Sequence, residues 1–485
     1  MKDHFLACAE AQMPRIYKKE IVPSIEMQTL GIGDSFVIDL GNHYVGYFSF
    51  VMGWVKVYID APVRLRVRFA ETRRDLEYDY TPYMTRSIGA WLQEDVIHID
   101  FPGEYKMPRR YAARYIRITV ECTTRPLTLS NFKFTAQTSA DVSATPESTS
   151  RDPRLADIER VSLHTLQNCM HRVFEDGPRR DRRLWIGDLR LEALTNYYTF
   201  KNLSLVRRCL YLFAAADKNI SGFIPAYVYE NPVYVSGYWF LQDYSLLFAV
   251  TLCDYYEHTG DQKVFYDIYP VAKSQLDAMH AHLGDDGIVT VAPKGDVFID
   301  WCDGLGKITS LHGVYLYALA SMADTLKKLG HPDEKLYRER YESAKKAALE
   351  KLYNREINAF VCERDGGRPS VHSTVWMILG GVIEGEKAIE ALEKARNSPE
   401  SFKPFTPYMN HYLTEALLKL GQTEEAFSHI RSYWGSMLDL GADTFFEMHV
   451  PGDPEYAPEC GGREFNSMCH AWSCTPAYFI RKYKK

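Results

Sequence analysis

The sequence has little of what marks a metal, redox or nucleotide site. Its ten cysteines are scattered without a CxxC pair, and no two histidines have HxxxH spacing. We therefore expect neither a metal site nor another cofactor. A P-loop, a GxGxxG motif and the GxSxG elbow of serine hydrolases are absent as well. Among enzyme classes, these absences favour enzymes that use carboxyl groups for catalysis.

Long apolar runs and long runs of one charge are also missing. No stretch reaches the roughly 20 apolar residues of a membrane helix, and the apolar run 5–9 is too short for a signal peptide. Acidic and basic residues are interspersed at a net charge of −6, which argues against nucleic acid or a membrane as a partner. Together with the unpaired cysteines, these features favour a cytoplasmic location, although a chain trimmed of an export signal would look the same.

Apolar and aromatic residues are abundant instead. Hydrophobic residues make up 46% of the 485-residue chain, and 33 of its residues are tyrosine. This is enough apolar material for sizeable packed cores over two or three domains. Aromatic rings also form platforms for sugar rings, whose C–H faces are apolar, although packing in the core is the commoner role of any single ring.

The two parts of the chain have different hydrophobic periods. Strand-like alternation at 64–70 and 115–120, broken by turn residues, predicts a β-sandwich domain over 1–145 with a Ser/Thr/Ala-rich linker at its end. From about 154 onward the period is helical, and roughly a dozen helices are linked alternately by short and long connectors. This predicts an (α/α)6 barrel over 146–485. An open α-solenoid is the alternative, but its repeats should share sequence and length, and these segments do not.

The long connectors carry acidic residues beside aromatic ones. We expect these connectors to gather at one end of the ring, where loops hold functional residues. Cleavage of a glycosidic bond needs two carboxyl groups, one as acid and one as base or nucleophile. The acidic candidates are Asp176, Asp181, Asp188, Asp243, Asp300, Asp303, Asp443, Glu447 and Glu459.

Each of these acids also has a purely structural alternative, as a salt-bridge partner or a helix cap. Asp188 directly precedes a helix predicted at 189–198, where it would serve as the N-cap. The arginines of 179–183 could pair with these acids at the surface. Spacing alone does not decide which two carboxyl groups would act together.

The connector at 176–188 carries a resemblance to a known family. Its sequence, DGPRRDRRLWIGD, resembles the D-C-P-x-R-(D)-E-R-L-G-W-x-G-D stretch of the α-L-rhamnosidases of glycoside hydrolase family 78. The segments YWGSMLDLGADTFFEMH (433–449) and SMCHAWSCTPAYFI (467–480) resemble two further segments of that family. The resemblance extends over about 35–480, and it implies an (α/α)6 barrel behind a β-sandwich domain.

The resemblance also implies roles for individual residues. Asp181 falls on the general acid, where the family has a glutamate, so its side chain is one methylene, about 1.5 Å, shorter. Glu447 falls on the general base. Three residues fall on substrate-lining positions near the acid, namely Asp176, Trp185 and Asp188, and His470 falls on a substrate contact.

The mechanism implied is single-step inversion on a carbohydrate substrate that contains rhamnose. The methyl group of rhamnose suits an aromatic wall, for which the candidates are Trp185, Trp239, Trp301 and Trp472. Asp243 and Asp300 complete the predicted substrate-binding set. Three alternatives stay open: a barrel glycosidase for another sugar, a uronate-acting hydrolase or lyase that uses the arginines and tyrosines, and a sugar-binding protein without activity.

Overall fold

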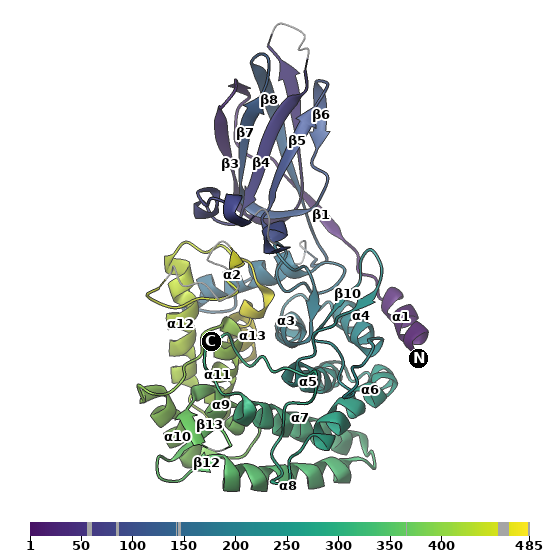
Figure 1. Cartoon of the computed structure of the whole chain (residues 1–485), viewed down its shortest axis with the longest axis vertical. Coiled ribbons are helices and arrows are strands. Elements are labelled where there is room, and N and C mark those ends of the chain that lie inside the picture. The colour runs from purple at the N-terminus through teal and green to yellow at the C-terminus, as the bar shows by residue number, and fades with distance from the viewer. Residues whose placement is uncertain are drawn as a thin grey trace.

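The computed structural model describes all residues except 56–60, 84–86, 142, 144–146, 365, 454–464 and 484–485. It has an N-terminal domain of antiparallel strands that stands on a larger helical domain (Figure 1). None of the described helices combines the length and apolar character that crossing a bilayer requires.

Eight antiparallel strands form the N-terminal domain. They are joined in the order β1-β8-β3-β7-β4-β5, while β2 also pairs with β8 and β6 with β3. The 20-residue β3 pairs with β7 through its first half and with β8 through its second. The strands are β1 (Tyr17–Ile21), β2 (Gln28–Leu30), β3 (Ser35–Trp54), β4 (Val63–Ala70), β5 (Glu94–Ile99), β6 (Gly103–Lys106), β7 (Tyr111–Cys122) and β8 (Leu127–Thr138).

The alternation read from the sequence explains how this sheet packs. In β4, Leu65 and Val67 are fully buried in the core of the domain. Arg66, between them, points outward and binds Glu94 at 2.5 Å. A period of two thus places apolar side chains on one face and ion pairs on the other. The predicted strand-rich N-terminal domain is confirmed.

Twelve helices form the second domain as six hairpins in a ring. The inner helices follow one another as α3, α5, α7, α9, α11 and α13, and each contacts an outer partner. The last inner helix packs against α2, so the ring is closed (Figure 1). The bounds are α2 (Pro153–Cys169), α3 (Ile186–Tyr198), α4 (Leu203–Ala214), α5 (Gln242–Thr259), α6 (Gln262–Ala281), α7 (Ile308–Leu329), α8 (Glu334–Lys351), α9 (Val371–Leu379), α10 (Gly385–Asn397), α11 (Pro407–Lys419), α12 (Thr423–Asp439) and α13 (Pro476–Tyr483).

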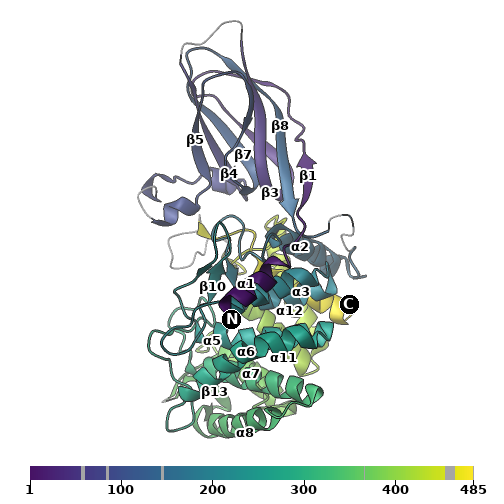
Figure 2. The ribbon, with the colours of Figure 1, turned by 90° about the vertical axis from the view of Figure 1, so that its right-hand side faces the viewer.

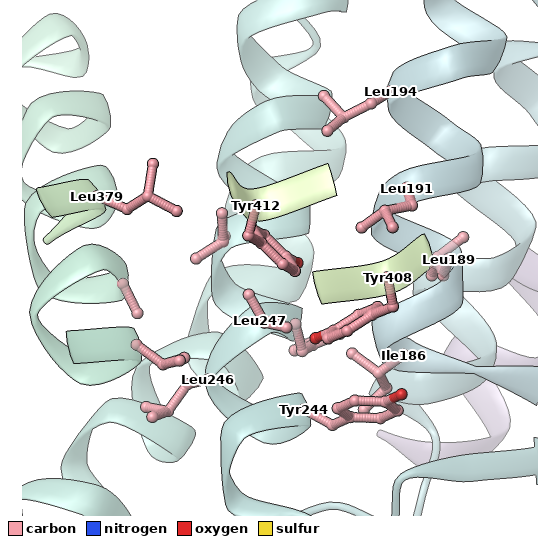
Figure 3. Packing of buried hydrophobic residues seen from close by; sticks show 14 of the residues in the cluster. Ile186, Leu189, Leu191, Leu194, Tyr244, Leu246, Leu247, Leu379, Tyr408 and Tyr412 are labelled. Carbon is pink, nitrogen blue, oxygen red and sulfur yellow. The ribbon is translucent and has the colours of Figure 1, made fainter. Parts of the chain in front are cut away.

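Closure of the ring confirms the predicted (α/α)6 barrel and rules out the open solenoid. The inner helices fill the middle of the ring with apolar and aromatic side chains, among them Leu191 of α3 and Tyr412 of α11 (Figure 3). Gly330 ends α7 in the left-handed conformation, with φ at +65°. A residue with a β-carbon is strained there, which is why this glycine could be read as the end of a helix.

The first helix belongs to the barrel by its packing. Helix α1 (Lys2–Glu10) lies beside α4 (Figure 1) and against the helical domain (Figure 2), and Phe5 and Ala9 are part of the apolar core of that domain. The Arg208 guanidinium also donates to the Ala9 carbonyl at 2.7 Å. The chain therefore starts on the barrel and crosses to the sheet after α1, whereas the sequence pattern predicts a sheet domain over the whole of 1–145.

Buried polar contacts hold the two domains together near the start of the barrel. The backbone N–H of Ser139 donates to the Met170 carbonyl at 2.7 Å, and Arg110 binds Glu175 at 2.7 Å. The loop that follows α2 is therefore fixed between the sheet and the ring.

Candidate active site

A cavity of about 300 Å³ opens where the long connectors meet the sheet domain. Four of the long connectors contribute to it: 176–188 supplies three acids and Trp185, 227–239 and 296–303 supply aromatic rings, and 443–459 supplies Glu447. The lining consists of Trp91, Asp176, Arg180, Asp181, Arg183, Trp185, Asp188, Trp239, Leu241, Tyr244, Phe298, Trp301, Glu447, His470 and Trp472.

The loop 176–185 is folded by its own backbone. The N–H of Arg182 donates to the Gly177 carbonyl, and the N–H of Asp176 donates to the Arg183 carbonyl, both at 3.1 Å. Arg182 adopts a left-handed conformation with φ at +55°. Strand β9 (Leu184–Trp185) then pairs with β10 (Tyr227–Tyr229), so the connector is a rigid edge of the cavity.

Helix α3 begins earlier than the sequence suggested. It starts at Ile186, and Trp185 occupies the N-cap position. Asp188 is therefore not the cap but lies in the first turn, where the helix dipole favours a carboxylate. Its buried side chain faces the cavity.

Gly187 is required by the packing of this first turn. A β-carbon at Gly187 would lie 2.4 Å from the ring of Tyr244. Only glycine lets the ring approach this closely and form the floor of the cavity beside Asp188. The G-D pair of the motif thus has a steric reason for its glycine.

The acids of the cavity raise one another's pKa. Burial raises the pKa of Asp176 well above its usual range, and the charges of Asp181 and Asp188 raise it further. Burial likewise raises the pKa of Glu447, while Arg180 opposes that shift. Buried acids with raised pKa values are typical of sites that carry out acid–base chemistry.

Arg180 lies between the two carboxylates that the family resemblance singles out. Its Nη2 binds Glu447, and its Nε is 3.5 Å from Oδ1 of Asp181. Its guanidinium also lies over the ring of Trp91, 5.0 Å from the ring centre, and donates to the Phe465 carbonyl at 2.9 Å. The sheet domain therefore helps to hold this arginine through Trp91.

Asp181 lies between two arginines at the edge of the cavity. Arg183 Nη1 is 3.8 Å from its Oδ2, and the Arg183 guanidinium rests on the rings of Tyr227 and Tyr229. Its buried Oδ1 accepts no hydrogen bond from any residue that the structure describes, and Arg180 Nε is 3.5 Å away. Because Asp181 lines the cavity, its carboxyl group is within reach of a ligand there.

Glu447 is fixed by the C-terminal segment. Its Oε2 accepts a hydrogen bond from the Ser467 N–H at 3.2 Å, and its carbonyl accepts one from the Trp472 indole at 2.9 Å. His470 lies against Trp472 at 4.3 Å between ring centres, and its Nδ1 is 3.6 Å from Asp188. Burial lowers the pKa of His470 well below its usual range, and Arg180 adds to this shift, so its ring is neutral.

Aromatic rings form the walls. Trp185 packs at right angles to Trp239, with 5.9 Å between ring centres, and Phe298 stacks on Trp472 at 5.8 Å. The buried indole nitrogens of Trp185 and Trp301 have no hydrogen-bond partner among the described residues. Apolar faces with free donors suit a sugar, whose ring faces are apolar and whose rim is polar.

Two predicted substrate contacts lie behind the wall and do not line the cavity. The carboxylate of Asp243 accepts hydrogen bonds from the N–H groups of Phe298 and Ile299 at 3.1 and 2.9 Å. Asp300 binds His372 at 2.8 Å and the Thr406 hydroxyl at 2.6 Å. The oxygens of both carboxylates are hydrogen-bonded within the protein. The two residues therefore stabilise the connector that carries Phe298 and do not face the cavity.

Two further acidic candidates, Asp443 and Asp303, also fall outside the lining. Asp443 forms an ion pair with Arg114 of the sheet domain at 3.4 Å, and Asp303 is exposed. Glu459 lies outside the described residues.

Sequence reasoning missed the contribution of the sheet domain and of several connector residues. Trp91 ends a short 3-10 helix, Ser87–Trp91, and no periodic pattern marks it. Arg180 and Arg183 stand inside the recognised motif, but their alternation with acids fits a surface salt-bridge network equally well. Tyr244 and Phe298 read as ordinary core residues.

The described residues include one group that could hold a metal ion, and it is not in this cavity. His4 and Cys8 of α1 and Asp267 of α6 have their ligand atoms within 4.8 Å of one another. His4 also forms an ion pair with Asp267 at 2.9 Å, which accounts for the cluster as a tie between α1 and the barrel.

A closed ring of helical hairpins with paired carboxylates in an aromatic cavity defines a six-hairpin glycosidase. Residues 144–483 match the bacterial α-L-rhamnosidase six-hairpin glycosidase domain, and residues 8–137 match the glycosyl hydrolase family 78 α-rhamnosidase N-terminal domain. The chain belongs to family 78, the α-rhamnosidases.

Solved structures agree with this assignment. A rhamnosidase from Klebsiella oxytoca with rhamnose bound is 35% identical, with a TM-score of 0.94 over 99% of this chain and 98% of its own. The family 78 rhamnosidase of Bacillus sp. GL1 is 25% identical, with a TM-score of 0.79 over 95% of this chain but 48% of its own. A Streptomyces avermitilis α-L-rhamnosidase complexed with L-rhamnose, 17% identical with a TM-score of 0.70, shares the fold. A search of curated protein sequences found no match.

Proposed function

We propose that the protein releases terminal α-L-rhamnose from oligosaccharides or glycosides in one step, with inversion at the anomeric carbon. The main observation behind this proposal is that the Arg180 guanidinium contacts the carboxylates of both Asp181 and Glu447 inside an aromatic cavity. The Klebsiella relative, similar over its whole length, holds rhamnose. Membership in the α-rhamnosidase family supports the same substrate class.

The two carboxyl groups divide the proton transfers. Asp181, which lines the cavity, donates its proton to the glycosidic oxygen as that bond breaks. Glu447 removes a proton from a water molecule that attacks the anomeric carbon from the opposite face. Inversion requires room for this water, with carboxyl groups about 6.5–9.5 Å apart.

The other lining residues hold the sugar. Asp176 and Asp188 accept hydrogen bonds from its hydroxyls, and His470, held neutral, offers a further polar contact. The indoles of Trp185 and Trp301 present apolar faces to the methyl group and free N–H donors to the rim. Binding of this kind fixes the anomeric carbon between the acid and the base.

Substrates with different leaving groups test the assignment of acid and base. A 2,4-dinitrophenyl rhamnoside needs little protonation of its leaving oxygen, whereas an alkyl rhamnoside needs it fully. We therefore expect Asp181→Asn to lower kcat by about 10²–10⁴ on the alkyl rhamnoside and far less on the dinitrophenyl one. Glu447→Gln should lower kcat on both substrates equally. Equal losses in Asp181→Asn on both substrates would contradict its role as the acid.

We also propose that the protein works in a reducing compartment, the cytoplasm. The nine described cysteines are all free thiols, and Sγ of Cys169 lies 4.0 Å from Sγ of Cys469 without a bond. Fractionation of the native cells with an antibody tests this placement, and recovery in the exported fraction would contradict it.

A further inference from the structure

A second, larger cavity adjoins the active site on the other side of the acid. It measures about 630 Å³ and lies between the domains. The sheet domain contributes Tyr47, Arg109 and Arg110 to its lining, and the barrel contributes Arg172, Arg182 and Tyr229. Its volume falls in the range of small-molecule sites, about 300–1,000 Å³.

The two cavities meet at Asp181, which lines both of them. The left-handed turn at Arg182 sends consecutive side chains to opposite sides: Arg183 lines the active site and Arg182 the second cavity. A general acid touches the glycosidic oxygen, so the first atoms of the leaving group lie within a few ångströms of Asp181. The second cavity is thus within reach of the leaving group.

Most of the arginines of the second cavity are already neutralised. Arg109 binds Asp95 at 2.9 Å, Arg110 binds Glu175 at 2.7 Å, and Arg172 binds Glu230 at 3.0 Å. Each of these guanidinium groups has a carboxylate within salt-bridge distance, so none of them calls for a further anion.

Arg182 is the exception. It donates to the carbonyls of Pro178 and Arg110 at 2.7 and 2.8 Å and to the Gln93 amide oxygen at 3.4 Å. No carboxylate of the described residues forms a salt bridge with it. Burial and the charge of Arg110 lower the pKa of Arg182 to about 10, so it still carries its charge at neutral pH. The charge of Glu175 opposes that shift, but Glu175 forms its salt bridge with Arg110. A largely buried charge without a salt bridge of its own is costly, and a ligand anion would offset that cost.

We propose that this cavity binds a leaving group that carries a carboxylate, a hexuronic acid linked to the rhamnose. One guanidinium without a salt bridge matches a single negative charge. Its Nε and Nη2 already donate to the protein, which leaves Nη1 to donate to a carboxylate oxygen. A phosphate monoester carries about −1.5 to −2 at pH 7 and would need more cationic partners. Tyr47 and Tyr229 supply aromatic faces for the ring of the uronic acid. The inference rests on the proposed function, whose leaving group it names.

The test compares two substrates of the same shape, rhamnosyl-α-(1→4)-glucuronate and its uncharged methyl ester. For the unmodified protein we expect kcat/KM to be about tenfold or more higher on the acid than on the ester, as a charge-assisted hydrogen bond gives. In Arg182→Gln that ratio should fall close to one. The matched control is Arg160→Gln, whose side chain is exposed on α2 and paired only with Asp157, and it should keep the ratio.

A second measurement needs neither turnover nor a variant. Calorimetry with the intact protein compares the binding of D-glucuronate with that of methyl D-glucuronate. We expect the acid to bind at least tenfold more tightly at low salt, with a preference that shrinks as ionic strength rises.

These experiments distinguish a failure of the proposed uronate site from a failure of the proposed rhamnosidase function. Hydrolysis of acid and ester at equal rates, or equal binding of the two sugars, would overturn the uronate site and leave the rhamnosidase function in place. No turnover on these substrates or on p-nitrophenyl rhamnoside would contradict the proposed function, while calorimetry would still decide whether the cavity binds uronate. A preference that survives in folded Arg182→Gln would also overturn the assignment to Arg182.

Discussion

Arg180 contacts both carboxylates that we assign to catalysis, and its charge acts on them differently. It binds Glu447 directly and lies 3.5 Å from Asp181. Burial raises the pKa of Glu447, and Arg180 opposes that shift. The arginine thereby keeps the base ionised at a lower pH than burial alone would allow.

Removing Arg180 should therefore move the pH profile. In Arg180→Gln the pKa of Glu447 rises further, so the acidic limb of kcat/KM, which reports ionisation of the base, shifts to higher pH. We expect a shift of about one unit or more, together with a lower maximum rate. Profiles recorded beside Arg160→Gln, the exposed control, measure this. An acidic limb that stays in place would contradict the role of Arg180.

Asp188, a proposed contact to the sugar, should lower the stability of the folded protein at neutral pH. Burial raises its pKa well above the usual range, and the charges of Glu447 and Asp181 add to the shift. The folded state thus binds more protons than the unfolded state, so this group lowers stability as pH rises above its unfolded pKa of about 3.9.

Asp188→Asn should accordingly be more stable than the unmodified protein at pH 7, by about 1–2 kcal/mol, and less active. The gain should vanish below about pH 4, where the aspartate is protonated in both states. Denaturant unfolding at pH 7 and pH 4 measures it, with exposed Asp157→Asn as the control. A loss of stability at pH 7 would contradict the electrostatic account.

At the scale of elements, the first turn of α3 packs closely against Tyr244. Gly187→Ala would place a β-carbon 2.4 Å from the Tyr244 ring, so the ring or the helix must move. We expect a loss of about 1–3 kcal/mol and a higher KM. Gly435→Ala in α12 is the matched control, because its nearest neighbours are the guanidinium atoms of partly exposed Arg154. Equal losses of stability in the two variants would show that Gly187 has no special steric role.

A helix boundary or a residue's role could be predicted from the sequence only where neighbouring residues alone determine it. The end of α7 at Gly330 is open to prediction, because glycine itself favours the positive φ found there. The start of α3 at Ile186 is not, because pairing of Leu184 with Val228 places it. Asp243 was assigned to the substrate, but its carboxylate binds the backbone at Phe298 and Ile299, a contact across 55 residues of sequence that spacing does not reveal.

At the scale of the whole molecule, a buried ion cluster joins the two domains behind the active site. Arg179 binds Glu71 at 3.2 Å and lies 3.6 Å from Asp75, and all three are buried. Glu71 also accepts a hydrogen bond from the Met468 N–H at 2.7 Å, next to the segment that carries His470. The interface and the cavity therefore share one network.

Replacing Arg179 should destabilise the joined domains. Arg179→Met leaves buried Asp75 without its cation and Glu71 with only His43 as an ion-pair partner among the described residues, which costs about 3–5 kcal/mol. Burial raises the pKa of Asp75, so protonation should relieve part of this cost, and the loss should be smaller at pH 5 than at pH 8. Thermal unfolding at both pH values measures it. The control, Arg431→Met, breaks a partly exposed pair with Asp152 and should cost less than about 1 kcal/mol. A loss as small as that of the control, or one independent of pH, would contradict this account.

The class of the molecule could be read from its sequence, whereas the joint site between its domains could not. The change of period near residue 154 predicted the two domains, and the family resemblance named Asp181 and Glu447. Trp91 and the lining of the second cavity depend on how the sheet stands on the barrel. No local pattern encodes that arrangement.

The central claim is that Asp181 and Glu447 hydrolyse an α-L-rhamnoside with inversion. Proton NMR of the sugar released in the first minutes, before the anomers interconvert, tests it most directly. We predict that β-L-rhamnose forms first and that the α-anomer grows in later by mutarotation. Release of α-L-rhamnose first would contradict the account.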